Sequence, residues 1–532
     1  MMKKTPTLVL GMCLMIVPSL GMAQTQNVVG SSNKTAVVVS VNKDGDLIDP
    51  NIYGQMLEDC NDKVVYGGVV DIRGRENAAV TDLLKPLQIP VMRWPAGTMI
   101  YNYEWKKGIG QERRPEMEQI WGGIEYYTFG TDEFLQWCDR LDIEPYINIP
   151  MGNNNTYGHS LGEAIDWIEY TNGNPSTGMG AMRARNGHEA PYNVRYWCLG
   201  NENYLGCKFH KAENSTEYSA LLSKWSSTLK SLYPDISILG VGHLKDWNEE
   251  VLETCGEHID YLTLHYYYTS VVDDGQMAEP EKGLYSGELV EANIRLMSPD
   301  LDAYNTSYGR QDNPIRFSID EWNNRHNVRT DKGNRFDRQD PRRVFDIPAT
   351  ATMLNVFCRN CRHIGMANYI FPVNGHGLVK TTSLGAYRSA TYYVFELYRK
   401  YMHGRLAECS VTGPGLSDVR LADVASLSGD VNPLTLEEKK DLCYVDAAAA
   451  YHEDELVISL VSRSYDKAQK VDVCIPEGYK VVETITLGSN DVTDMNTEFR
   501  PDTIIPVITE TAKTNLSLQP CGMALVICKK QQ

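Results

Sequence analysis

Two short apolar segments of this chain each end in a glutamate. In RYWCLGNEN (195–203), four apolar residues are followed by Gly, Asn and Glu202, and in RFSIDEWN (316–323) a similar segment ends at Glu321. Apolar runs of this length are typical of strands buried on both faces of a parallel sheet. Because a parallel barrel places its catalytic groups at the carboxyl ends of its strands, we expect Glu202 and Glu321 to face one pocket.

Such a pair of glutamates is suited to glycoside hydrolysis. Two carboxylates about 5 Å apart carry out the retaining reaction, in which one attacks the anomeric carbon and the other protonates the leaving oxygen and then deprotonates water. A cation such as Arg93 would keep the nucleophile ionised, whereas the acid must be partly desolvated to hold its proton.

Other polar side chains fall near the ends of the remaining predicted strands, among Trp and Tyr residues of the kind that stack on sugar rings. They are Glu58, Arg93, Asn201, Tyr267 and Asn368. Each also has a structural interpretation: an ion pair for Glu58 or Arg93, packing for Tyr267, and strand termination for Asn201. His265 is interpreted as a buried histidine with satisfied hydrogen bonds and is not included in the predicted site.

The elements that would position these residues alternate along the chain. Strand patterns start at Ile52, Pro90, Glu144, Arg195, Asp235, Tyr261, Arg316 and Gly365. Helical patterns lie between them, such as 214–233, where Asn214 and Glu217 form a capping box. Eight strand–helix units, with no glycine-rich dinucleotide motif, favour a (β/α)8 barrel over an open doubly wound sheet.

A last helix is expected within residues 386–402, and beyond it short β-rich runs predict a β-sandwich or jelly roll without helices. The apolar strand at 34–41 is not needed by the barrel and is expected to join this sandwich. The predicted organisation is therefore a signal peptide at 1–23, an N-terminal strand segment at 24–50, a catalytic barrel at 51–403 and a C-terminal β-sandwich at 404–532.

Composition excludes several classes of function. The chain has 532 residues and a formal net charge of −18, which disfavours nucleic acid and anionic membrane surfaces as partners. Lys3 and Lys4 precede an apolar run that is too short to span a membrane, so we expect a periplasmic or extracellular protein. Cys358 and Cys361 form the only C-x-x-C, without a second pair, so neither a metal site nor a cofactor is predicted.

From about Asn51 to its end, the chain resembles glycoside hydrolase family 51, whose typical activity is that of an α-L-arabinofuranosidase. The resemblance is carried by IYGQMLED, VMRWPAGT, YNYEWKKGIGQERRP, FGTDEFLQWC, VRYWCLGNEN, IDYLTLHYYY and FSIDEWN. It implies a (β/α)8 barrel with a C-terminal jelly roll, Glu202 as acid/base and Glu321 as nucleophile. It further implies that Glu58, Arg93, Asn201 and Tyr267 bind the sugar or orient the carboxylates.

Three positions depart from the family pattern: Ala96 replaces a glycine, Thr98 replaces Asn or Cys, and Asn368 replaces Gln. The expected function is a retaining, exo-acting α-L-arabinofuranosidase that removes terminal arabinofuranose from arabinan, arabinoxylan or related oligosaccharides. The alternatives are an endo-β-glucanase or β-xylosidase on the same scaffold, and a non-catalytic carbohydrate-binding homologue. The sequence is compatible with a homo-oligomer and does not define its size.

Overall fold

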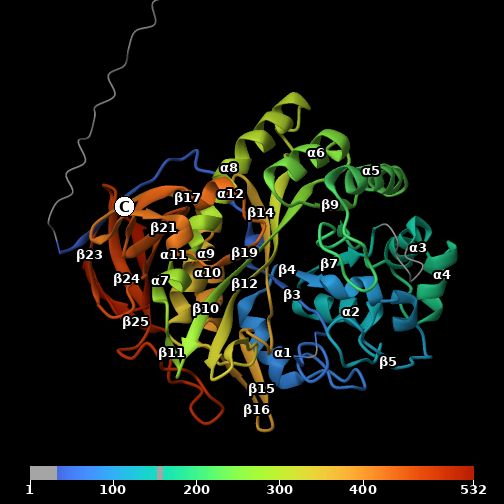
Figure 1. The fold of residues 1–532 in the computed structure, drawn as a ribbon, viewed down its shortest axis with the longest axis horizontal. Helices are drawn as coiled ribbons and strands as arrows, with labels where there is room; N and C mark the ends of the chain where they lie inside the picture. Colours follow the sequence, from blue (N-terminus) through green and yellow to red (C-terminus); the bar gives the residue numbers. More distant parts are fainter. Residues whose placement is uncertain (1–32, 61, 153–159, 532) are drawn as a thin grey trace, which may run out of the picture.

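The computed structural model describes residues 33–60, 62–152 and 160–531, so the predicted signal peptide lies outside the described residues. Eight parallel strands form a closed barrel in which each strand pairs with the next along the chain and the last pairs with the first (Figure 1). The strands are β3 (Gly54–Met56), β4 (Val91–Trp94), β7 (Glu144–Ile149), β8 (Tyr196–Leu199), β9 (Ser237–Val241), β10 (Tyr261–Asp273), β12 (Arg316–Thr330) and β14 (Ile364–Tyr369). The predicted (β/α)8 barrel is confirmed.

Helices follow the strands and cover the outside of the barrel. The main ones are α1 (Ala78–Leu84), α2 (Thr131–Leu141), α3 (Leu161–Asn172), α5 (Ser215–Leu232), α6 (Lys245–Cys255), α8 (Ser286–Ser307), α9 (Asp346–Arg359) and α10 (Tyr392–Tyr401). The Asn214–Glu217 capping box opens α5 as predicted. Over the described residues, no helix combines the length and the apolar character that a membrane crossing requires.

Two predicted elements begin later than expected. The first strand is preceded by a 3-10 turn over Pro50–Tyr53, because Pro50 lacks a backbone N–H for a sheet and Asp49 accepts a hydrogen bond from the Asn51 backbone. The last helix starts at Tyr392 rather than near 386. Residues before it form β16 (Gly385–Arg388), which pairs with β15 (Val379–Thr382).

A second, β-rich domain lies beside the barrel, on the left in Figure 1. Its sheet contains β17 (Gly404–Thr412), β21 (Val445–His452), β22 (Glu455–Ser462), β23 (Gln469–Cys474), β24 (Tyr479–Leu487), β25 (Val507–Glu510), β26 (Asn515–Leu518) and β27 (Met523–Lys530). The N-terminal β1 (Thr35–Ser40) lies between β17 and β23 in this sheet. Alternate residues of these strands form a separate apolar core.

The segment between β17 and β21 was expected to lack helices, and this prediction is wrong. It contains α11 (Leu421–Val424) and α12 (Pro433–Leu436), which pack near α8. Between them β19 (Leu427–Gly429) pairs with β10 of the barrel. One segment beyond residue 404 therefore belongs with the barrel, because β19 forms its hydrogen bonds with a barrel strand and not with the sandwich.

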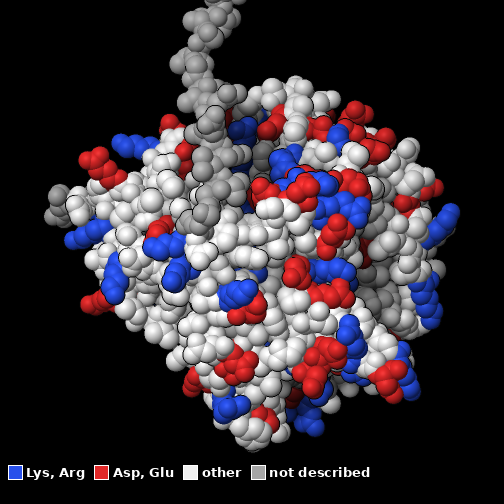
Figure 2. Space-filling view, turned by 60° about the vertical axis from the view of Figure 1, so that its left-hand side comes forward, with Lys and Arg blue, Asp and Glu red and all other residues white. Residues whose placement is uncertain are grey.

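Two barrel strands are much longer than the others. β10 and β12 extend beyond the barrel end and remain paired, and β12 continues into a hairpin with β13 (Gly333–Phe336). These extensions form part of the wall above the carboxyl ends of the strands. On the molecular face in Figure 2, Lys and Arg residues alternate with Asp and Glu residues, with no continuous basic area of the kind that binds nucleic acid.

Candidate active site

A tight turn after β8 presents Glu202. Gly200 has φ +99°, and a Cβ at this position would lie 2.1 Å from Asn203 Oδ1, so glycine is required. Glu202 itself has φ +45°, a conformation that non-glycine residues seldom adopt. Asn203 holds the turn by donating to the Met151 carbonyl and to Glu213. The strained turn places the Glu202 side chain at the open end of the barrel.

Glu321 is held by three neighbours on other strands. Arg93 Nη1 donates to its Oε1 at 2.7 Å, and the Tyr267 hydroxyl donates to its Oε2. Burial disfavours the charged form, but His265 and Arg93 outweigh it and lower the pKa of Glu321 to about 2. A permanently ionised carboxylate at this position is what a nucleophile requires.

Arg93 is fully buried and its guanidinium reaches three groups. Besides Glu321, it contacts Asp320 Oδ2 at 3.1 Å and donates to Asn201 Oδ1 at 2.6 Å. Asn201 is adjacent to Glu202, so one arginine connects Glu321 with the turn that bears Glu202. The planar, five-donor geometry of arginine makes this arrangement inaccessible to lysine.

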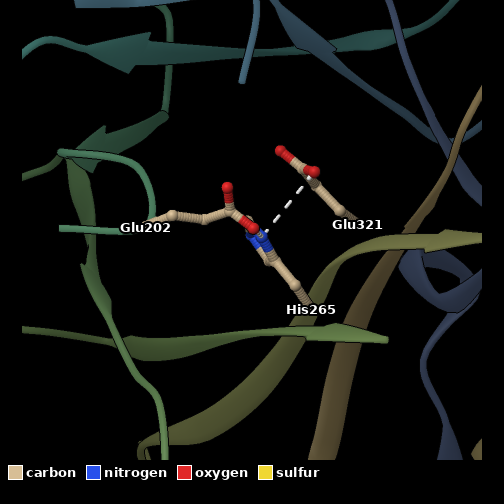
Figure 3. Close-up of side chains that lie close together, drawn as sticks. All are labelled: Glu202, His265 and Glu321. Atoms are coloured by element: carbon tan, nitrogen blue, oxygen red, sulfur yellow. Dashed lines mark hydrogen bonds and ion pairs between the residues drawn. The ribbon is translucent and has the colours of Figure 1, made fainter. Parts of the chain in front are cut away.

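The two glutamates face each other across a histidine, as Figure 3 shows. One oxygen of Glu202, one of Glu321 and a nitrogen of His265 all lie within 4.8 Å of one another. His265 Nδ1 is 3.0 Å from Glu202 Oε1 and 3.6 Å from Glu321 Oε2. Burial opposes a charged imidazole, but Glu321 and Glu202 raise the pKa of His265 to about 9.

The interpretation of His265 as a merely satisfied core residue is therefore wrong. It lies two residues before Tyr267, on the same face of β10, and so points into the same space. That alternation is the sequence signal that could have identified it. A cation at these three groups would have to displace the proton from His265, because a protonated imidazole has no free lone pair for a metal. With its proton, the histidine offsets the negative charge of Glu321.

Glu58 forms another wall of the pocket, at the end of the first barrel strand. Its Oε1 accepts hydrogen bonds from the Gly97 backbone at 3.1 Å and from Trp121 Nε1 at 3.0 Å. Burial and the charge of Glu321 raise the pKa of Glu58 to about 7. A Cβ on Gly97 would lie 2.5 Å from Glu321 Oε1, so this glycine leaves space for the Glu321 carboxylate.

These groups line one pocket that is open to solvent. Of the predicted site residues, Glu58, Glu202, Tyr267 and Glu321 line it, and Trp121, Arg325, Phe336 and Arg338 are additions from its rim. Arg93 and Asn201 lie beneath it and orient the glutamates. Asn368 was predicted to bind substrate, but it is fully buried and donates to Asp320 at 3.3 Å, so it supports the Arg93 ion pair instead.

Comparison with known proteins connects this geometry to a family. Two family models match, the "Alpha-L-arabinofuranosidase 1 domain" over residues 83–282 and the "Alpha-L-arabinofuranosidase C-terminal domain" over 320–521. A protein of Aspergillus niger named "Probable alpha-L-arabinofuranosidase C" is 30% identical, over 84% of this chain and 88% of its own length. This chain belongs to the α-L-arabinofuranosidases of glycoside hydrolase family 51.

Other family members resemble it over nearly their whole length. The "Intracellular exo-alpha-(1->5)-L-arabinofuranosidase 1" of Bacillus subtilis is 28% identical over 86% of this chain and 90% of its own. The solved family 51 enzyme from Thermotoga petrophila superposes with a TM-score of 0.76 at 25% identity, covering 93% of this chain and 99% of its own. The family fold thus includes both the barrel and the β domain.

In this arabinofuranosidase the C-terminal half also supports the His265 and Glu202 side of the site. Asp430, which directly follows β19, is fully buried. Its Oδ2 accepts a hydrogen bond from the His265 backbone at 2.5 Å, and its Oδ1 lies 2.6 Å from His243 Nδ1. The segment that crosses between the domains therefore positions His265, which in turn contacts both glutamates. Nothing in the local sequence around Asp430 indicates this contact.

Proposed function

We propose that this chain hydrolyses terminal, non-reducing α-L-arabinofuranosides by double displacement. The observation that carries the proposal is the opposition of Glu202 and Glu321, with oxygens within 4.8 Å of each other, a spacing that suits a covalent intermediate and not an intervening water. The natural partners would be arabinose-containing oligosaccharides or polysaccharides such as arabinan and arabinoxylan. No cofactor takes part in this reaction.

In the first step, Glu321 attacks the anomeric carbon while Glu202 gives its proton to the glycosidic oxygen, and the leaving group departs. In the second step, Glu202 takes a proton from water, the water oxygen attacks the same carbon, and the bond to Glu321 breaks. Two inversions give net retention. Arg93, Tyr267 and His265 keep Glu321 anionic before and after each turnover.

Glu58, Gly97 and Thr98 line the same pocket as the two glutamates. We infer an exo mode of action from the Bacillus subtilis relative, which is named an exo-alpha-(1->5)-L-arabinofuranosidase. This disfavours an endo-glucanase, and the intact pair of glutamates disfavours a non-catalytic binding protein.

The proposal is tested with 4-nitrophenyl glycosides. We expect turnover of the α-L-arabinofuranoside and not of the β-xyloside or β-glucoside. Glu321→Ala should abolish turnover, and azide should restore part of it with an inverted glycosyl azide as product. Glu202→Ala should still cleave the activated aryl substrate but lose about 10²–10⁴ in rate on a disaccharide, whose leaving group needs a proton.

Glu477→Ala, which changes an exposed glutamate of the β domain, is the matched control and should retain wild-type turnover. Near-wild-type rates in either active-site variant would overturn the assignment of roles.

We further propose that the protein is exported. The support is the pattern at its N-terminus, two lysines followed by a short apolar run and small residues near Ala23. The Bacillus subtilis relative is named as intracellular, so membership of the family does not settle the compartment. Detection of a mature chain beginning near residue 24 in the periplasm or medium would support export, and a full-length cytoplasmic chain would contradict it.

A further inference from the structure

One arginine on the pocket wall has no role in the mechanism above. Arg325 lies on β12 four residues beyond Glu321, in a stretch whose pairing with β10 is regular, so Glu321, Asn323 and Arg325 share one face. Four residues of strand correspond to a rise of about 13 Å toward the mouth. Exposure increases along the same path, from buried Glu321 to half-buried Arg325. Arg325 is therefore placed where the remainder of a substrate leaves the pocket.

The guanidinium of Arg325 is held by aromatic stacking on its flat faces and not by hydrogen bonds at its edges. Its central carbon lies 3.3 Å from the centre of the Tyr267 ring and 5.5 Å from that of Phe336. Across the described residues, no hydrogen bond or ion pair engages its nitrogen atoms. Stacking fixes the plane of a guanidinium but leaves its in-plane N–H donors available for a planar oxyanion.

The neighbouring arginine on the rim provides a contrast. Arg338 also stacks on aromatic rings, those of Trp121 and Phe336, but its Nη1 donates to Asp62 at 2.8 Å. The charge of Arg338 is thus neutralised within the protein. The charge of Arg325 is not, although the pocket holds Glu58, Glu202 and Glu321 and the whole chain carries −18.

We propose that Arg325 binds a carboxylate on the leaving-group side of the scissile bond, so that the preferred substrates carry arabinofuranose on a uronic acid. This inference rests on the proposed function and names its substrate class. An overall acidic protein repels acidic glycans at long range, so accepting one requires a local, pre-oriented cation. Arg325 meets that requirement, with donors that match the two oxygens of a carboxylate.

The test compares two disaccharides that differ at one group. In both, α-L-arabinofuranose is linked to the same position of the second sugar, which is galacturonic acid in one and galactose in the other. For the wild-type enzyme we expect kcat/KM to be about tenfold or more higher for the acidic disaccharide at low salt, because a hydrogen bond to a charged group is stronger than a neutral one. The ratio should fall as salt is added.

Arg325→Gln should bring the ratio of the two kcat/KM values close to one, and Arg325→Lys should retain part of it. Arg325 stacks on Tyr267, which contacts Glu321. A loss of activity that arises through Tyr267 affects both substrates equally and cancels in this ratio. Arg329→Gln is the matched control: it changes the same charge on the same strand, but Arg329 is paired with Asp273 at 2.9 Å and lies outside the pocket, so the ratio should stay at the wild-type value.

Equal rates on the two disaccharides, together with normal turnover of 4-nitrophenyl α-L-arabinofuranoside, would overturn the assignment of Arg325 alone. An acidic preference that survives in Arg325→Gln would also overturn it. Failure to hydrolyse any arabinofuranoside, the nitrophenyl substrate included, would instead overturn the proposed function on which the assignment rests.

Discussion

Glu58→Gln is expected to make the protein more stable and less active, in a manner that depends on pH. In the folded protein, burial and the nearby Glu321 raise the pKa of Glu58 from its ordinary 4.5 to about 7. Between these values the folded state holds a proton that the unfolded chain releases. Stability is therefore lost as the pH rises from about 4.5, and the full cost of about 3 kcal/mol is reached above pH 7.

Glutamine removes this cost without removing the local hydrogen bonds. Both donors to Glu58, the Gly97 backbone and the Trp121 ring, bond the same oxygen, which an amide oxygen can replace. Thermal unfolding should show no difference between variant and wild type at pH 4.5 and a gain of roughly 4 °C at pH 8.5, the value for a unit of the size of the barrel. Turnover should fall, because the carboxyl group faces the sugar pocket.

Glu125→Gln is the matched control for this experiment. Burial raises the pKa of Glu125 to about 7 as well, and its Oε1 accepts hydrogen bonds from the Tyr66 hydroxyl and the Tyr127 backbone, but it lies outside the pocket. Glu125→Gln should show the same pH-dependent gain in melting temperature with unchanged kcat/KM. A Glu58→Gln melting difference that is constant with pH, or larger at pH 4.5 than at pH 8.5, would refute the reasoning.

Four further outcomes are expected. Gly97→Ala should reduce turnover at least about a hundredfold while the protein still folds, since its Cβ would lie 2.5 Å from a nucleophile oxygen; circular dichroism and kcat check this. Arg93→Lys should lower kcat by about 10²–10³ with a smaller change in KM, because lysine cannot bridge Glu321, Asp320 and Asn201 at once. Asp430→Ala should lower kcat by about tenfold and shift its pH profile, as His265 loses its backbone anchor; an unchanged profile would show that Asp430 only holds the domains together. Activity should persist in EDTA, since the proposed steps use only Glu321 as nucleophile and Glu202 as acid and base, and a loss of activity that zinc or calcium restores would contradict this.

Much of the fold could be predicted from local patterns. Buried strands such as 196–199 have no polar residue until they end, so their length and their last residue are both visible in the sequence. The predicted secondary structure was wrong where local sequence patterns compete with contacts to distant residues. Residues 386–388 continue a helical pattern but pair in a hairpin, and residues 421–436 follow β-rich sequence yet pack on the barrel. In both cases contacts with distant residues determined the local structure.

The sequence by itself placed Glu202 directly after one buried strand of a parallel barrel and Glu321 on another, because turns and apolar runs are properties of neighbouring residues. The strand was expected to end at Glu321, but β12 continues to Thr330. Only the tertiary structure decided what surrounds that pair. His265 is 63 residues from Glu202 and Asp430 is 165 residues from His265, and their contacts arise from packing between elements. The low pKa of Glu321, the stacked guanidinium of Arg325 and the burial of Asn368 likewise depend on neighbours in space, which spacing along the chain does not encode.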